Sequence, residues 1–187
     1  QNLTDMSLDE IYQLAHKVMR AAGCDEANAA AIADTVMRAE RDGSTSHGLF
    51  RIPGYVGSIK SGKVTADANP KIAQTLPSVL KVDGQMGYAP LALQAGLPQL
   101  AEAAHKTGIA VMSIVNSFHF AALWPETEYL SEQGLVGLAW TAFKPSVAPF
   151  GAKHAFFRTN PLSFAFPNPT PTPYVFDIAP SRLAKWN

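Results

Sequence analysis

The stretch that organises this chain is Glu40-Arg-Asp-Gly-Ser-Thr-Ser-His-Gly-Leu-Phe-Arg-Ile-Pro-Gly-Tyr55. It places a hydroxyl, an imidazole and a guanidinium close together in the sequence. His47 can move a proton near neutral pH, and Arg51 can hold a carboxylate with two hydrogen bonds. Ser46 can orient the imidazole or bind a substrate. The alternative is a polar loop between two helices, which a lone Ser-His pair does not exclude.

Three glycines, Gly43, Gly48 and Gly54, lie in the same stretch. Because glycine has no Cβ, we expect these positions to adopt positive φ or to let the backbone approach a ligand closely. The stretch is therefore predicted to fold tightly around its polar side chains.

Helices are expected on both sides. The capping-box pattern of Ser7-Leu-Asp-Glu10 starts a first helix, which ends at Gly23. Apolar spacing predicts a second helix from Asp25 to Arg41 and a third from Pro53 to Lys60. Residues 1–62 are thus predicted to form a helical N-terminal region that carries the Ser-His-Gly and Arg motif.

The pattern changes after residue 62, and the fold class expected for the chain is α/β. In order, we predict loops and short extended pieces at 63–77, a strand at 78–83, a turn at 83–90, a long helix at 90–106, apolar strands at 109–115 and 135–141 with a helix at 125–133 between them, and extended pieces at 162–166 and 174–178. The run 109–115 is typical of a strand covered on both faces. Residues 109–141 therefore have the order strand, helix, strand.

Composition narrows the function classes. The 187 residues are 47% hydrophobic and carry no net charge, so neither nucleic acid nor a membrane surface is expected as a partner. The first twenty residues contain no long apolar run, which predicts neither a signal peptide nor a membrane span. The single cysteine, Cys24, rules out an internal disulfide and fits a reducing, cytoplasmic location. The histidines show no metal-ligand spacing, so no metal is expected.

Further stretches are candidates for binding. Asn116–Leu123 follows the strand at 109–115, and the backbone amides of His119 to Leu123 could face a pyrophosphate. Pro161 disfavours a helical conformation at the preceding residue in Arg158-Thr-Asn-Pro161, where Thr159 offers a hydroxyl. Asp177-Ile-Ala-Pro-Ser181 could bind a ribose or a nicotinamide amide. The alternative in each case is an ordinary connection or turn.

No Gly-x-Gly-x-x-Gly follows any predicted strand, which argues against a standard Rossmann domain. Taken together, however, the stretches resemble the malate/L-lactate dehydrogenase type 2 family of NAD(P)-dependent oxidoreductases. The match consists of Asp42-Gly-Ser-x-Ser-His-Gly48, Arg51-Ile-Pro-Gly-Tyr55, Asn116-Ser-x-His119, Pro149-Phe-Gly151, Thr159-Asn-Pro161 and Asp177-x-Ala179. His119-Phe-Ala-Ala-Leu-Trp-Pro125 is most similar to the branch of Δ1-piperideine-2-carboxylate/Δ1-pyrroline-2-carboxylate reductases. Other branches oxidise 2-hydroxy acids such as malate, lactate or ureidoglycolate.

The resemblance implies a homodimer whose residues 63–187 form a mixed-sheet nicotinamide-binding region of non-Rossmann type, incomplete at its C-terminal end, with NADPH or NADH as the cofactor. It implies that His47 donates a proton, that Ser46 orients it, and that Arg51 holds the substrate carboxylate. Thr159 is expected to contact the substrate as well. The residues expected to line the cofactor are His119, Phe120, Ala121, Ala122, Leu123, Asp177, Ile178 and Ala179.

The sequence departs from the family pattern near its end. Arg158 and Trp186 stand where the family has glycine, and Pro180 stands where it has threonine. Asn187 occupies the position of the aspartate that completes a Ser-His-Asp relay, and an amide cannot stabilise an imidazolium as a carboxylate does. Three functions stay open: a reductase of cyclic imino acids, a 2-hydroxy acid dehydrogenase, and a degenerate or truncated member that acts as a binding or subunit partner.

Overall fold

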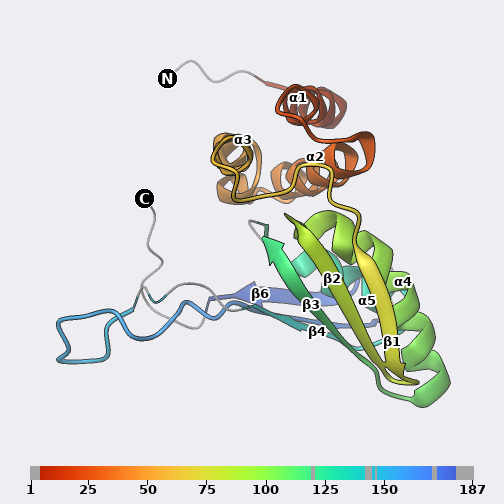
Figure 1. Ribbon diagram of the computed structural model, residues 1–187. Coiled ribbons are helices and arrows are strands. Elements are labelled where there is room, and N and C mark those ends of the chain that lie inside the picture. Colours follow the sequence, from red (N-terminus) through yellow and green to blue (C-terminus); the bar gives the residue numbers. More distant parts are fainter. Residues whose placement is uncertain (1–4, 119–120, 142–144, 146, 170–171, 180–187) are drawn as a thin grey trace. The chain divides into compact units, whose positions relative to one another are not determined.

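The chain folds into two compact units, unit 1 over Gln1–Ala122 and unit 2 over Leu123–Asn187 (Figure 1). This computed structural model describes residues 5–118, 121–141, 145, 147–169 and 172–179. The two compact units meet after Ala122. The boundary predicted at residue 62 is of another kind, because it separates the region that carries the Ser-His-Gly and Arg motif from the region expected to bind the cofactor. That functional boundary stays a prediction.

Three helices open unit 1, and all three are those predicted: α1 (Leu8–Ala21), α2 (Glu26–Arg41) and α3 (Ile52–Lys60). The capping box at the start of α1 is confirmed, because the Ser7 hydroxyl accepts the Glu10 N–H at 3.2 Å while the Glu10 carboxylate accepts the Ser7 N–H at 2.8 Å. The Ser7 N–H, and to a lesser extent the Ser7 hydroxyl, which donates to the Glu10 carboxylate at 2.9 Å, lower the pKa of Glu10. Asp25 caps α2 in a similar way through the Asn28 N–H.

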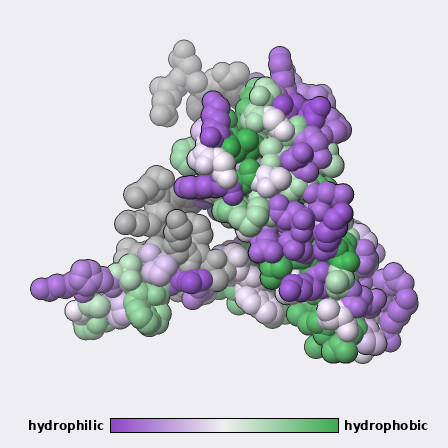
Figure 2. Space-filling model, in the orientation of Figure 1, coloured by the Kyte–Doolittle hydropathy of each residue, from purple (hydrophilic) through white to green (hydrophobic). Residues whose placement is uncertain are grey.

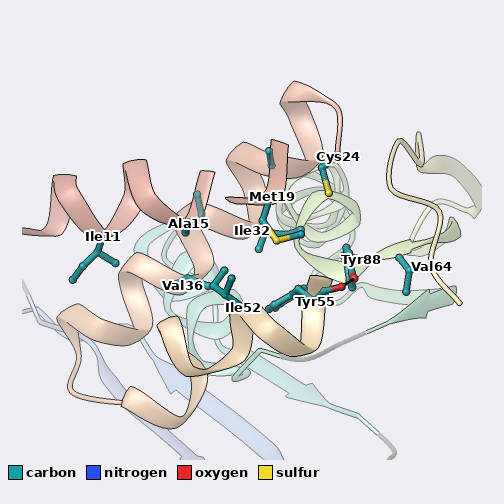
Figure 3. Close-up of a cluster of buried hydrophobic side chains, with 12 residues drawn as sticks. Ile11, Ala15, Met19, Cys24, Ile32, Val36, Ile52, Tyr55, Val64 and Tyr88 are labelled. Atoms are coloured by element: carbon teal, nitrogen blue, oxygen red, sulfur yellow. Dashed lines mark hydrogen bonds between the residues drawn. The ribbon is translucent and has the colours of Figure 1, made fainter. Parts of the chain in front are cut away.

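Buried apolar side chains from the three helices pack against one another (Figure 3). This core comprises Ile11, Ala15 and Met19 of α1, Ala29, Ile32, Ala33 and Val36 of α2, and Ile52 and Tyr55 of α3, with Cys24, Val64 and Tyr88. The Tyr88 hydroxyl donates to the Tyr55 carbonyl at 2.6 Å, and the two rings meet edge to face. Because α2 and α3 are both anchored in this core, the ends of the segment between them are fixed.

A mixed three-stranded sheet follows in unit 1. Its strands are β1 (Lys71–Leu76), β2 (Val79–Tyr88) and β3 (Val111–Phe118), in the order β1-β2-β3. The first pair is antiparallel and the second parallel. Helix α4 (Ala89–Thr107) packs on this sheet. Among the described residues, no helix is long and apolar enough to cross a membrane. The sheet of unit 1 is therefore mixed, although the sequence predicted a mixed sheet for the whole region 63–187.

Residues 83–90 do not form the separate turn that the sequence predicted. Strand β2 continues through them, with a shift of register against β3 between Asp83 and Gly87. The Asp83 carboxylate accepts hydrogen bonds from the Gln85 N–H at 3.0 Å and the Asn116 side-chain amide at 3.1 Å. These two bonds, the first the larger, lower the pKa of Asp83. A local hydrogen-bond network thus carries the strand through the irregularity, where Gln85 has a positive φ of 51°.

Strand β3 is not covered on both faces, as its apolar sequence predicted. It pairs only with β2 among the described strands, and Val111 is 47% exposed. Figure 2 shows hydrophobic residues on the surface where β1 turns into β2 and α4 leads toward β3, and Leu76 and Ile109 are exposed. The expectation failed because an apolar run shows that a strand avoids water but not that this unit alone provides the cover.

Unit 2 contains α5 (Trp124–Glu132), β4 (Gly137–Trp140), β5 (Leu162–Phe166) and β6 (Tyr174–Ile178). The strands form an antiparallel sheet in the order β4-β5-β6. Residues 109–141 do have the predicted order strand, helix, strand, but β3 and β4 belong to different sheets. Strand β4 pairs with β5, which follows it in the sequence, so the three elements do not form one parallel unit.

A buried hydroxyl pair ties α5 to its sheet. Thr127 Oγ1 and Ser163 Oγ lie 2.7 Å apart, and the Ser163 hydroxyl donates to the Phe176 carbonyl at 3.0 Å. Gly137 lies so close to α5 that a Cβ there would sit 2.9 Å from the Thr127 carbonyl oxygen. The position of α5 on the sheet is therefore set by hydrogen bonds as well as by close packing.

Candidate functional site

The predicted motif residues lie on two short turns between α2 and α3. Helix α2 ends at a glycine cap, in which Gly43 has φ of 73° and the Ser44 N–H donates to the Ala39 carbonyl at 2.8 Å. One 3-10 turn then covers Thr45–His47 and a second covers Leu49–Arg51, directly before α3. The chain thus places His47 and Arg51 at the ends of successive turns.

Two serine hydroxyls lie beside the His47 ring. Its Nδ1 is 3.0 Å from Ser46 Oγ and 3.3 Å from Ser44 Oγ. A hydroxyl can donate to Nδ1 or accept from it, so this pairing suits both the neutral and the charged ring. The arrangement directs Nδ1 toward the protein and leaves Nε2 on the opposite side of the ring. The neighbour predicted for His47, Ser46, is therefore in contact with it.

Ser44 was not among the residues predicted for this site. The signal was its position three residues before His47, because one 3-10 turn brings residues at that separation together. The backbone confirms this geometry, since the His47 N–H donates to the Ser44 carbonyl at 2.8 Å.

Arg51 has an unsatisfied donor. The residue is half-buried, and its Nε is fully buried without a hydrogen-bond partner among the described residues. A buried donor without a partner costs about 1–3 kcal/mol. A carboxylate would satisfy Nε and a terminal guanidinium nitrogen together once the groups that cover Nε move aside. The arrangement therefore suits an acidic ligand better than it suits the unliganded protein.

The three glycines of the motif have different roles. Gly43 has the positive φ that was expected, whereas Gly48 has φ of −85° and Gly54 lies inside α3 without positive φ. Positions 48 and 54 therefore do not have positive φ, and the other alternative, a close approach of the backbone to a ligand, stays a prediction there. Gly48 is needed for space, because a Cβ there would lie 2.0 Å from Oε1 of Glu40. At Gly54 the space is open.

A second group of candidate residues meets in unit 2. Asp177 Oδ2 accepts hydrogen bonds from the Leu123 N–H at 2.7 Å and the Trp124 N–H at 3.1 Å. A carboxylate at the N-terminus of a helix also interacts favourably with the helix dipole. Asp177 therefore caps α5 from β6, and it brings together two segments that were both predicted to line the cofactor.

This contact corrects one detail. The Leu123 amide, which was expected to face a pyrophosphate, instead faces the Asp177 carboxylate. The reason is that a carboxylate of the chain itself already occupies the start of α5. Ala121 is half-buried and Ala122 is buried beside it, while Ile178 and Ala179 are exposed.

The remaining predicted residues are placed only in part. Thr159 is half-buried, and it precedes Asn160, whose φ of 45° agrees with the expectation that Pro161 disfavours a right-handed helical residue there. His119, Phe120 and Asn187 lie outside the described residues. The roles assigned to all of these side chains stay predictions.

The chain matches the family described as malate/L-lactate dehydrogenase over residues 6–186. A Δ1-pyrroline-2-carboxylate/Δ1-piperideine-2-carboxylate reductase from Pseudomonas aeruginosa is 43% identical over 180 residues, which is 96% of this chain and 54% of that protein. A Δ1-pyrroline-2-carboxylate reductase from Ancylobacter novellus is 42% identical, over 96% of this chain and 53% of that protein. The chain spans about half the length of the curated relatives it matches.

Solved structures give the same assignment. The Δ1-piperideine-2-carboxylate reductase from Pseudomonas syringae pv. tomato matches with a TM-score of 0.92 and 38% identity, over 97% of this chain and 55% of the other. Malate dehydrogenase from Entamoeba histolytica matches with a TM-score of 0.90 and 28% identity, over 97% and 51%. With the sequence match covering nearly every residue, these similarities show that the chain belongs to the malate/L-lactate dehydrogenase family, as its motifs predicted.

Proposed function

We propose that this chain carries the carboxylate-binding and proton-donating groups of an NAD(P)H-dependent reductase of cyclic imino acids. The reaction would convert Δ1-piperideine-2-carboxylate to L-pipecolate and Δ1-pyrroline-2-carboxylate to L-proline. The observation that carries the proposal is the buried, unpartnered Nε of Arg51, one turn after His47. The reductase names of the similar Pseudomonas and Ancylobacter proteins support this substrate class.

Each group has a definite task. Arg51 binds the substrate carboxylate through two N–H groups and so fixes the orientation of the adjacent C=N bond. His47 gives a proton to the ring nitrogen as the imine carbon takes up hydride, so the C=N bond becomes a C–N single bond. Ser46 and Ser44 hold Nδ1, which orients the ring. On the family resemblance alone, we also propose Thr159 as a residue that contacts the substrate.

The described residues of unit 2 fit a role in cofactor binding. Ile178 and Ala179 offer exposed apolar surface beside Asp177. Ala121 and Ala122, which carry small side chains, are the last residues of unit 1. Asp177 has a second oxygen, Oδ1, besides the one that caps α5. These residues, with His119, Phe120 and Leu123, would hold the dinucleotide. When bound, it supplies hydride to the imine carbon.

The family relay would place an aspartate at position 187, where this chain has Asn187. The groups described at Nδ1 of His47 are hydroxyls. A hydroxyl orients an imidazole but stabilises its charged form less than a carboxylate does. We therefore expect a slower proton transfer than an intact relay would give.

A second candidate is a 2-hydroxy acid dehydrogenase, which the similarity to a malate dehydrogenase structure favours. Both functions need a carboxylate-binding arginine and a histidine that carries a proton. A third candidate is a non-catalytic binding or subunit partner. We also propose a homodimer, on the family resemblance, which sedimentation analysis would test.

The first assay measures oxidation of NADPH and NADH with Δ1-piperideine-2-carboxylate and Δ1-pyrroline-2-carboxylate. The second measures reduction of NADP⁺ and NAD⁺ with malate and lactate. We expect turnover of the cyclic imines and its loss in His47→Ala. Turnover of the hydroxy acids alone supports the second candidate. If nothing turns over, quenching of tryptophan fluorescence by NADPH separates binding from chemistry and points to the third.

A further inference from the structure

Helix α2 carries a glutamate whose side chain reaches the segment of His47 and Arg51. Glu40 lies in the last turn of α2, and its Oε1 accepts the Leu49 N–H at 2.8 Å. Leu49 is midway between His47 and Arg51 and begins the second 3-10 turn. The bond therefore fixes the end of α2 to the backbone that presents both side chains.

Gly48 makes room for this carboxylate. An ideal Cβ at Gly48 would lie 2.0 Å from Oε1 of Glu40, 2.4 Å from its Cδ and 2.7 Å from its Cγ. Real Cβ atoms do not approach other atoms so closely. The backbone of Gly48, with φ of −85° and ψ of −139°, also lies outside the β and α regions that L residues favour. A Cβ at position 48 would therefore displace the Glu40 side chain, which lies directly across the backbone at this point.

We infer that Glu40 is a positioning residue for the reaction proposed above, on which this inference rests. Its carboxylate holds the backbone between His47 and Arg51, and so sets the spacing between the proton donor and the carboxylate-binding group. A hydrogen bond from an amide to an ionised carboxylate is stronger than one between neutral groups. A displacement of about 1 Å at a reacting group can cost about 100-fold in rate.

Three variants of the 187-residue chain separate this role from general stability. Glu40→Gln keeps an oxygen that can accept the Leu49 N–H, Glu40→Ala removes it, and Gly48→Ala removes the space for it. We expect kcat/KM for Δ1-pyrroline-2-carboxylate to fall about 10- to 100-fold in the two alanine variants and by less than about 3-fold in Glu40→Gln. The matched control is Glu102→Ala, an exposed glutamate of α4 that pairs with Lys106, which should leave kcat/KM unchanged.

Two readouts decide the outcome. Kinetics are measured only on variants whose circular dichroism matches the unmodified chain, because a merely structural role would reduce the folded fraction and not kcat/KM per folded molecule. Hydrogen exchange of the Leu49 amide, followed by NMR, should be faster in Glu40→Ala and close to the unmodified rate in Glu40→Gln.

The inference is overturned if the unmodified chain is active and Glu40→Ala retains its kcat/KM, or if exchange at Leu49 is the same in all forms. Absence of turnover by the unmodified chain contradicts the proposed function instead. In that case the Leu49 exchange rates still show whether Glu40 holds the turn, so the two failures are distinguishable.

Discussion

In unit 1 the groups around His47 are joined by contacts between near neighbours in the sequence, whereas in unit 2 Asp177 binds amides that lie 53 and 54 residues earlier. The first arrangement needs only a helix end, a glycine cap and two tight turns. The second needs β6 to lie beside the start of α5, which only the folded sheet provides. Local substitutions should therefore affect chemistry in unit 1 and stability in unit 2.

The largest expected effect follows from Arg51. Replacing a partner of a buried charge pair costs about 2–5 kcal/mol, so Arg51→Met should lower kcat/KM about 30- to 5,000-fold. The same change removes a buried donor that has no described partner, so the free energy of unfolding without ligand should stay level or rise. Steady-state kinetics and urea unfolding measure the two effects. Arg38→Met, which breaks a surface pair with Asp34, is the control.

That prediction is wrong if Arg51→Met is clearly less stable than the unmodified chain but binds substrate equally well. Such a result would make Arg51 a structural residue, and substitutions in unit 1 would then affect stability, as is expected for unit 2.

The two serines beside His47 should show a smaller, coupled effect. Loss of one hydroxyl leaves the other at Nδ1, so Ser44→Ala and Ser46→Ala should each lower kcat by only about 2- to 12-fold, equivalent to about 0.5–1.5 kcal/mol. The double variant should lose more than the product of the two single losses, because no serine then holds the ring. Simple multiplicative losses would show that the hydroxyls do not share one task.

Asp177 should affect the stability of unit 2 and leave unit 1 unchanged. Removing a helix cap costs about 1–2 kcal/mol, so Asp177→Ala should destabilise unit 2, while Asp177→Asn should cost less because its amide oxygen still accepts. Hydrogen exchange of peptides from each unit, measured by mass spectrometry, locates the change. Ser7→Ala is the matched control, since it removes the α1 cap in unit 1. Faster exchange in unit 1 after Asp177→Ala would contradict the separation.

The smallest effect at neutral pH concerns Cys24. Burial raises the pKa of its thiol to about 11, with Asp25 adding to the rise, against 9.0 for an unperturbed thiol. The unfolded chain therefore loses the proton first as the pH rises. The protonated Cys24 thiol therefore contributes fully to the free energy of unfolding below pH 9, and this contribution is lost as the pH rises to 11. The loss amounts to about 2–3 kcal/mol.

Urea unfolding of the unmodified chain and Cys24→Ala at several pH values tests this. The difference in their free energies of unfolding should be constant between pH 6 and 8 and should shrink above pH 9. A parallel pH dependence in both proteins would show that Cys24 does not contribute. The buried Cys24 thiol of the native protein should also react slowly with iodoacetamide. If the stability of unit 1 does not depend on unit 2, Asp177→Ala should leave that reaction rate unchanged.

Much of unit 1 could be predicted from the sequence because its signals are local. The Ser7 capping box, the Asp25 cap and the glycine cap at Gly43 act within a few residues, and the helices between them appear at the expected positions. The contact between Ser46 and His47 was predictable for the same reason. Even the missed Ser44 lies only one turn away.

The sheets were predicted less well because pairing is decided by distant residues. The strands at 162–166 and 174–178 were located correctly, but the sequence did not show that β4 pairs with β5 instead of joining the sheet of β3. Asp83, at the irregular part of β2, accepts a hydrogen bond from the Asn116 amide, which lies 33 residues away in the sequence. Periodicity identifies a strand but not its neighbour.

By itself, the sequence determined the N-terminal helices, the turn that carries His47 and Arg51, and the family. Only the tertiary structure decided that Glu40 lies across Gly48, that Arg51 Nε is buried without a described partner, and that Asp177 caps α5. The physical reason is range: caps and turns form between residues a few positions apart, whereas burial and long-range hydrogen bonds exist only once separate elements have packed together.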